Sequence, residues 1–162
     1  MDQLDLSDFF KTKGEAVDFS SRLSDISDKA YQTDFDLSRL LTASLGVTKK
    51  EKFIKLLREN NVSEGSKNKL IGFFNRIQEQ IAAIAVITMT VAIEPPEEIM
   101  TELAQWFLTN INRQVLFDIR VDPVLAGGAT ISFNGKFKDY TIRPVFDKYL
   151  QEILDKKPTA NQ

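Results

Sequence analysis

Carboxylates are the main side chains of this chain that could act as acids, bases or metal ligands, because its 162 residues include no Cys and no His. The absence of these two residue types excludes disulfides, thiolate and imidazole metal sites, Ser-His triads and Cys nucleophiles within the chain. The acidic pairs that we consider as candidates are Asp34 and Asp36, Glu97 and Glu98, and Asp118 and Asp122. Each pair lies at an expected helix start or strand end, and nothing in the sequence separates its two pKa values into an acid and a base. An enzyme using carboxylates is the weaker alternative, and we expect no catalytic residue, metal or cofactor.

Binding sites for phosphate groups have little support in the sequence. A phosphate loop needs the order Gly-x-x-x-x-Gly-Lys-Ser/Thr, which residues 65–67 (Gly-Ser-Lys) do not follow, and the pair Gly127-Gly128 is typical of a turn. The chain has 21 Lys+Arg against 23 Asp+Glu, a formal net charge of −2. The lysine-rich run from Lys49 to Arg58 contains Glu51 and is typical of a solvated helix face. We therefore expect no binding of nucleic acid.

The first half of the chain has the apolar spacing of amphipathic helices. Apolar residues recur three and four positions apart over residues 14–32, 36–45, 48–60 and 66–84, and Gly46 is expected to end the second helix. The links between these segments are short and polar, so the helices can bury their apolar faces only against one another. The sequence predicts an all-helical bundle as the first domain, residues 1–84.

This bundle is rich in Phe for its size. Packing in the core is the ordinary role of such residues. The alternative is a groove between helices that would receive the amphipathic helix of a partner protein. The candidate groove residues are Phe19, Leu23, Phe73 and Phe74.

The second half of the chain changes to a mixture of strands and helices. A β-branched run over 86–93 predicts a strand that ends at Pro95-Pro96, where a helix with an apolar face begins. Two further strands are predicted over 115–121 and 129–133, followed by an Asn134-Gly135 turn and a last helix from Thr141. The second domain, residues 85–162, is therefore β-α-β-β-α, and the fold class of the chain is α+β.

The last helix has more apolar residues than packing on one face of a sheet requires. An exposed strip on it that docks another helix is a hypothesis for function. The apolar residues of this helix are Ile142, Val145, Phe146, Tyr149, Leu150 and Ile153.

Neither a secretory signal nor a membrane span is expected. The first residues are acidic and lack a basic flank followed by an apolar run. The longest apolar stretch without charge, Ile81 to Ile93, is shorter than the roughly 20 residues of a spanning helix. We expect a cytoplasmic protein.

A motif in the second half resembles the signature of the F-type ATP synthase delta subunit family, which includes the mitochondrial oligomycin-sensitivity-conferring protein. Residues 121–128 read Val-Asp-Pro-Val-Leu-Ala-Gly-Gly, similar to the family's Val-Asp-Pro-Ser-Leu-Ile-Gly-Gly, and Asp139-Tyr140-Thr141 is similar to its Asp-x-Ser before the last helix. In this motif Pro123 fixes φ, Gly127 and Gly128 let the chain reverse, and Leu125 is expected to anchor the turn in the core. The family motif residues are Asp122, Pro123, Leu125, Gly127, Gly128, Asp139 and Thr141.

The resemblance implies a non-catalytic subunit at the top of the peripheral stalk of a proton-driven ATP synthase. The helical domain would hold N-terminal helices of the alpha subunits, and the second domain would hold the C-terminal helices of the b subunits. Contact with the membrane, at its cytoplasmic face, would be made only through the complex. A free-standing helix-binding adaptor of the same fold and a small carboxylate enzyme remain as alternatives.

Overall fold

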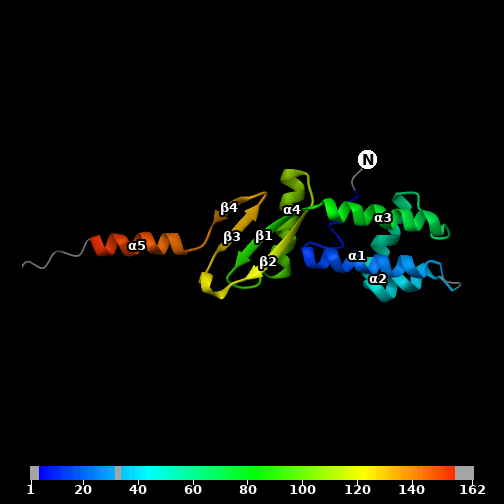
Figure 1. Cartoon of the computed structure of the whole chain (residues 1–162), viewed down its shortest axis with the longest axis horizontal. Helices are drawn as coiled ribbons and strands as arrows, with labels where there is room; N and C mark the ends of the chain where they lie inside the picture. The colour runs from blue at the N-terminus through cyan, green and yellow to red at the C-terminus, as the bar shows by residue number, and fades with distance from the viewer. Residues whose placement is uncertain (1–3, 32–33, 156–162) are drawn as a thin grey trace, which may run out of the picture.

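The structure, a computed structural model that describes residues 4–31 and 34–155, confirms the α+β class. Helices make up the first half of the chain, and a four-stranded mixed sheet forms the centre of the second half (Figure 1). The elements in chain order are α1 (Lys13–Lys29), α2 (Leu37–Glu59), α3 (Lys67–Ala83), β1 (Ala85–Val91), α4 (Glu97–Ile111), β2 (Val115–Val121), the 3-10 turn η1 (Pro123–Leu125), β3 (Ala129–Phe133), β4 (Lys136–Asp139) and α5 (Arg143–Asp155).

The helical part forms where the apolar spacing predicts it. At the start of α1, Thr12 and Glu15 form a capping box, in which each side chain accepts a hydrogen bond from the other residue's backbone N–H. Gly46 interrupts α2 with a φ of 78°, so the two predicted helices follow one another across a kink. The three helices bury an aromatic core, in which Phe53 lies 6.2 Å from Phe19 and 5.8 Å from Phe74 between ring centroids.

The sheet has the strand order β2-β1-β3-β4. β1 and β2 run parallel and are connected through α4, whereas β3 and β4 add to the other side of β1 in antiparallel pairs. Ile87 and Met89 of β1 and Phe117 of β2 share the face that α4 covers, and Met100 of α4 packs against them. The other face carries the alternate residues, among them Thr88 and Thr90.

The two halves are linked through β2. Leu116 is buried in the core of the helical part, although it belongs to the sheet. Phe117 pairs with Thr12 in an isolated bridge, and its N–H donates to the carbonyl of Lys11 at 3.0 Å. The change from helix to strand falls at residues 83–85, and the predicted division into domains 1–84 and 85–162 remains a prediction.

The structure differs from the expected second half in two ways. It contains one more strand, β4, because the Asn134-Gly135 turn returns the chain alongside β3. The helix α5 does not pack on the sheet as expected but runs away from it, and in the described part of the chain no helix or strand lies alongside it (Figure 1). No helix among residues 4–31 and 34–155 is long and apolar enough to span a membrane.

Candidate partner-binding surfaces

The first part of the family motif builds the turn after β2. The carboxylate of Asp122 accepts the backbone N–H of Val124 at 3.0 Å, and the N–H of Asp122 donates to the carbonyl of Val91 at 2.8 Å. Pro123, with its φ fixed by the ring, opens the 3-10 turn that follows. Leu125 is only half-buried and belongs to neither core cluster, so the expectation that it anchors the turn in the core is wrong. The physical reason is that η1 lies beyond the end of β2, where none of the helices in the described part of the chain packs closely.

The second part of the motif joins this turn to the start of α5. Gly128 has a φ of +81°, and a Cβ added there would lie 2.3 Å from the carbonyl oxygen of Tyr140 and 2.7 Å from the Cα of Thr141. Gly127 accepts the N–H of Ile142 at 3.3 Å. Only a residue without a side chain fits at Gly128, because its backbone is in contact with the backbone that leads into α5.

A carboxylate fixes the last residues before α5. Asp139 accepts the backbone N–H of Thr141 at 2.8 Å. Hydrogen bonds from the hydroxyl and then the backbone N–H of Thr141 hold the pKa of Asp139 below its usual value of 3.8. Thr141 itself is buried. The structure thus brings all the predicted motif residues to one joint, which sets the direction in which α5 leaves the sheet.

The apolar residues of α5 are exposed along one side of the helix. Val145 is 72% exposed and Phe146 is 59% exposed, and Tyr149 and Ile142, the residue just before α5, are exposed as well. Their positions, i, i+3, i+4 and i+7, place them on one helix face. The side chain of Ile153 lies outside the described residues. We call the face made by Ile142, Val145, Phe146 and Tyr149 the α5 stripe.

The candidate groove residues of the helical part lie in its core. Phe19, Leu23, Phe73 and Phe74 are all buried, because they fill the space between the three helices. They do not line an open groove in this structure. A partner helix would therefore contact other residues of the bundle, or would reach these four only if a covering segment moved.

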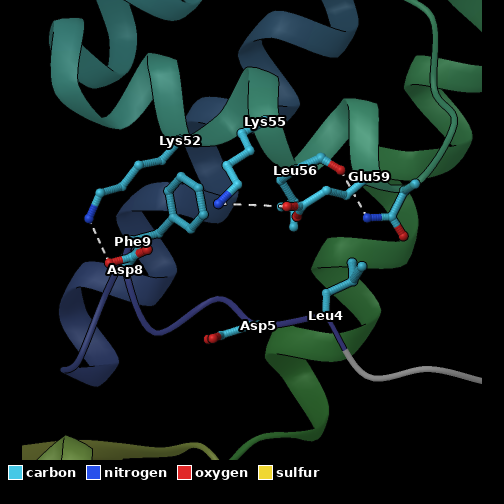
Figure 2. Close-up of a pocket in the computed structure, with 9 residues that line it drawn as sticks. Leu4, Asp5, Asp8, Phe9, Lys52, Lys55, Leu56 and Glu59 are labelled. Atoms are coloured by element: carbon cyan, nitrogen blue, oxygen red, sulfur yellow. Dashed lines mark hydrogen bonds and ion pairs between the residues drawn. The ribbon is translucent and has the colours of Figure 1, made fainter.

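Such a covering segment is present. Residues Leu4–Lys11, which we call the N-terminal strap, lie across the helical part before α1 begins. A hollow of about 610 Å³ separates the strap from α2, and Figure 2 shows Asp8 reaching from the strap to Lys52 at its edge. The sequence carries a signal for the strap in the helical spacing of Leu6, Phe9 and Phe10, which the prediction did not use.

Three of the acidic residues considered for catalysis make structural contacts. Asp36 caps α2 through the N–H of Arg39, and Asp122 caps η1. Glu97 forms an ion pair with Lys11 across 3.5 Å. Within the residues that the structure describes, no group of three or more His, Cys, Asp or Glu is placed to hold a metal ion.

Comparisons with known proteins agree with the motif. A family model for the ATP synthase delta (OSCP) subunit matches residues 18–153. The ATP synthase subunit delta of Fervidobacterium nodosum is 27% identical over 106 residues, which are 65% of this chain and 58% of that protein. The chain thus matches less than two thirds of the length of this relative.

A solved structure with some likeness is the cryo-EM structure of the Toxoplasma gondii mitochondrial ATP synthase hexamer. The sequence identity is 11%, and the match covers 87% of this chain and 84% of that chain. The TM-score of 0.35 is too low to support an argument about the arrangement of the elements.

The family match covers both halves of the fold. Residues 18–153 extend from α1 into α5 and include every residue of the joint between the sheet and α5. The chain belongs to the ATP synthase delta (OSCP) subunit family.

Proposed function

We propose that the chain is the non-catalytic delta subunit of an F-type ATP synthase, a stator component that links the catalytic head to the peripheral stalk. Family membership supports this proposal, and the α5 stripe is the observation that carries it. A helix that, with the residue before it, exposes four large apolar side chains on one face has the chemistry of one half of a helix-helix contact. The chain would take no cofactor and would have no catalytic residue.

The proposed partners of the α5 stripe are the C-terminal helices of the stalk b subunits. Val145 and Phe146 would lie at the centre of this contact, and Tyr149 could keep its hydroxyl at the edge in water. On α5, Arg143 and Asp147 form an ion pair across 4.0 Å, and both side chains are well exposed. The helix therefore offers an apolar face for the partner and retains a charged one for solvent.

The helical part would hold N-terminal helices of the alpha subunits. Figure 1 shows the helical part and α5 at opposite ends of the chain, with the sheet between them. Two partners bound at these ends would be held apart by the length of the subunit. A stator must resist the torque of the rotor, so both contacts need slow dissociation, the rate in which most affinity differences between related interfaces appear.

This role implies a location at the membrane through the complex alone. The energy-transducing membrane would be reached through the b subunits, with this chain on the cytoplasmic face. The proton path would run through other subunits, because the stator link has only a mechanical role.

Native mass spectrometry of the purified chain with two synthetic peptides tests the proposal. The peptides are the N-terminal helix of the alpha subunit and the C-terminal helix of the b subunit from the same genome. We expect each to bind in a discrete ratio. We also expect Val145→Asp to weaken binding of the b peptide at least tenfold, since the change removes an apolar side chain that the contact would bury and adds a charge there.

A second exposed valine provides the matched control. Val47 lies in α2 and is 62% exposed, so Val47→Asp makes the same chemical change far from α5. The b peptide should bind Val47→Asp as it binds the unchanged chain. Equal loss of binding in both variants, or no loss in either, contradicts the α5 contact. If neither peptide binds the unchanged chain, the free-standing adaptor becomes the better account.

A further inference from the structure

The N-terminal strap is deeply seated although it has no helix or strand. Leu6 is 0% exposed, Phe9 is 3% exposed, and Leu4 and Phe10 are buried as well. The ring of Phe9 lies 5.1 Å from that of Phe19, and the ring of Phe10 lies 5.5 Å from it. The strap therefore covers the aromatic core where the sequence suggested a groove.

Side chains of the bundle bind the backbone of the strap. Gln80 of α3 contacts Leu4 twice: its Oε1 accepts the Leu4 N–H at 3.0 Å, and its Nε2 donates to the Leu4 carbonyl at 2.6 Å. Lys49 of α2 donates to the carbonyl of Phe9 at 2.8 Å. Contacts to backbone atoms do not depend on which side chain the segment carries, and they are typical of a bound peptide.

The apolar residues of the strap have the spacing of a helix. Leu6, Phe9 and Phe10 are at i, i+3 and i+4, and the N–H of Phe9 donates to the carbonyl of Leu6 at 3.0 Å. This single turn presents its apolar side chains to the bundle as one face of an amphipathic helix would. Asp8, between the apolar positions, forms an ion pair with Lys52 of α2 at 2.6 Å.

Three hollows lie along the edges of the strap. Besides the hollow of about 610 Å³ beside α2 in Figure 2, a hollow of about 250 Å³ lies between Leu4, Asp5 and the end of α4. Gln114 borders this second hollow, and both polar atoms of its side chain are buried without a hydrogen-bond partner. A third hollow, of about 390 Å³, borders Ser7 and Lys11. Lifting the strap breaks only its own contacts with the bundle, so it should need less free energy than unfolding the whole bundle.

We propose that the N-terminal strap is a built-in ligand that closes a helix-binding groove of the bundle, and that a partner helix must displace it. The partner that takes the place of the strap is an amphipathic helix with apolar residues at i, i+3 and i+4 and an acidic residue facing Lys52. This inference rests on the proposed function in one respect, because it takes the alpha subunit's N-terminal helix as the partner. The free subunit keeps its aromatic core covered until that helix arrives.

The first test weakens the strap at a contact to its backbone, which a helical partner would not need because its backbone groups bond within the helix. Gln80→Ala removes both hydrogen bonds to Leu4, so a labelled alpha N-terminal peptide should bind this variant of the full chain about tenfold more tightly than the unchanged chain. The matched control is Gln78→Ala. Gln78 is on the same helix but donates to the carbonyl of Ser20 at 3.1 Å and to the hydroxyl of Ser24 at 2.8 Å, both on α1. Where the alpha peptide binds the unchanged chain, an equal affinity for Gln80→Ala would overturn the proposal.

The second test does not need the alpha subunit. The double substitution Leu6→Glu and Phe9→Glu places charges at two buried positions and should eject the strap, with circular dichroism to verify that the helices remain. A synthetic peptide with the sequence of residues 4–12 should then bind this variant at least tenfold more tightly than the unchanged chain, whose own strap competes at high effective concentration. If the double variant loses its helices, Gln80→Ala serves for the same comparison.

The two probes separate failure of this inference from failure of the proposed function. If the strap peptide binds no variant that retains its helices, no groove lies beneath the strap and the inference is overturned. If the strap peptide binds the opened variant but the alpha peptide does not compete with it, the groove and its closure are supported. In that case only the proposed contact with the alpha subunit fails.

Discussion

Gly128 should be the residue at which the smallest change most disturbs the joint between the sheet and α5. We predict that Gly128→Ala destabilises the chain and weakens the b peptide, because the added Cβ has no space. It would lie 2.3 Å from the carbonyl oxygen of Tyr140 and 2.7 Å from the Cα of Thr141, closer than Cβ atoms are found to such atoms. Both neighbours are backbone atoms, so no side-chain rotation relieves the overlap.

The magnitude has two contributions. A residue with a side chain at φ +81° costs about 1 kcal/mol relative to glycine. Forcing an additional carbon into a packed site costs about 1–3 kcal/mol more. Gly135 separates the cost of the positive φ from the cost of the steric overlap, because its φ is +73° but nothing lies within 4 Å of an added Cβ. We therefore expect a loss of about 3 kcal/mol for Gly128→Ala and about 1 kcal/mol for Gly135→Ala.

Urea unfolding followed by fluorescence of Trp106, the single tryptophan of the chain, measures this difference. Trp106 lies on α4, with its ring 5.2 Å from that of Phe107, which packs against the cluster beneath the sheet. It therefore reports the part of the chain that contains the joint. Equal losses of stability in Gly128→Ala and Gly135→Ala would refute the argument, because only the first has a steric conflict. Retention of b-peptide affinity in Gly128→Ala would refute the role of the joint in directing α5.

Two further predictions concern the start of α1 and the link between the halves. Burial disfavours the charged form of Glu15, but hydrogen bonds from the backbone of Lys11 and Thr12 outweigh this effect and lower the pKa of Glu15 from 4.5. The charged carboxylate therefore stabilises the fold fully above about pH 4.5, and this stabilisation is lost as the pH falls through the lowered pKa. Glu15→Ala should cost about 1 kcal/mol at neutral pH and progressively less below about pH 4.5 in urea titrations, and a cost that does not change with pH would exclude this account. Leu116→Ala should cost about 3 kcal/mol and shift the unfolding midpoints from circular dichroism and from Trp106 fluorescence together, since Leu116 lies in the helical core. An unchanged Trp106 midpoint would instead support two independent domains divided at residue 84.

Local patterns account for the elements that the sequence predicts well. The spacing of apolar residues locates α1 and α3 within a few residues, and the predicted strand over 115–121 coincides with β2. Gly46 ends a helical segment as expected, because its left-handed φ is favourable only for glycine. The strand β4 was missed because Lys136–Asp139 is short and mostly charged, so its apolar pattern gives no signal. It exists because it pairs with β3, a contact that the local sequence does not show.

The candidate sites also divide into features that a local sequence pattern can indicate and features that depend on contacts between distant parts of the chain. The motif residues lie together at one joint, which a local pattern of Asp, Pro and Gly can indicate. The position of α5 could not be predicted, since an amphipathic helix has the same sequence whether it packs on its own sheet or on another protein. Burial of Phe73 and Phe74 in the core is the ordinary expectation for such residues. The position of the strap depends on contacts between Leu4 and Gln80, two residues that are far apart in the chain, so the local sequence does not show it.

The surface of the sheet explains why burying the α5 stripe against a partner helix would be more favourable than burying it against the sheet of its own chain. Opposite α4, Thr88 pairs with Asp118 and Thr90 with Arg120, so this face carries hydroxyl and charged groups. Packing the α5 stripe there would remove those groups from water without supplying hydrogen-bond partners, at a cost that offsets burial of the apolar side chains. An apolar helix of another protein carries no such penalty. The polar face of the sheet and the closely packed joint at Gly128 would therefore act together, since both would keep the stripe available for the proposed partner helix.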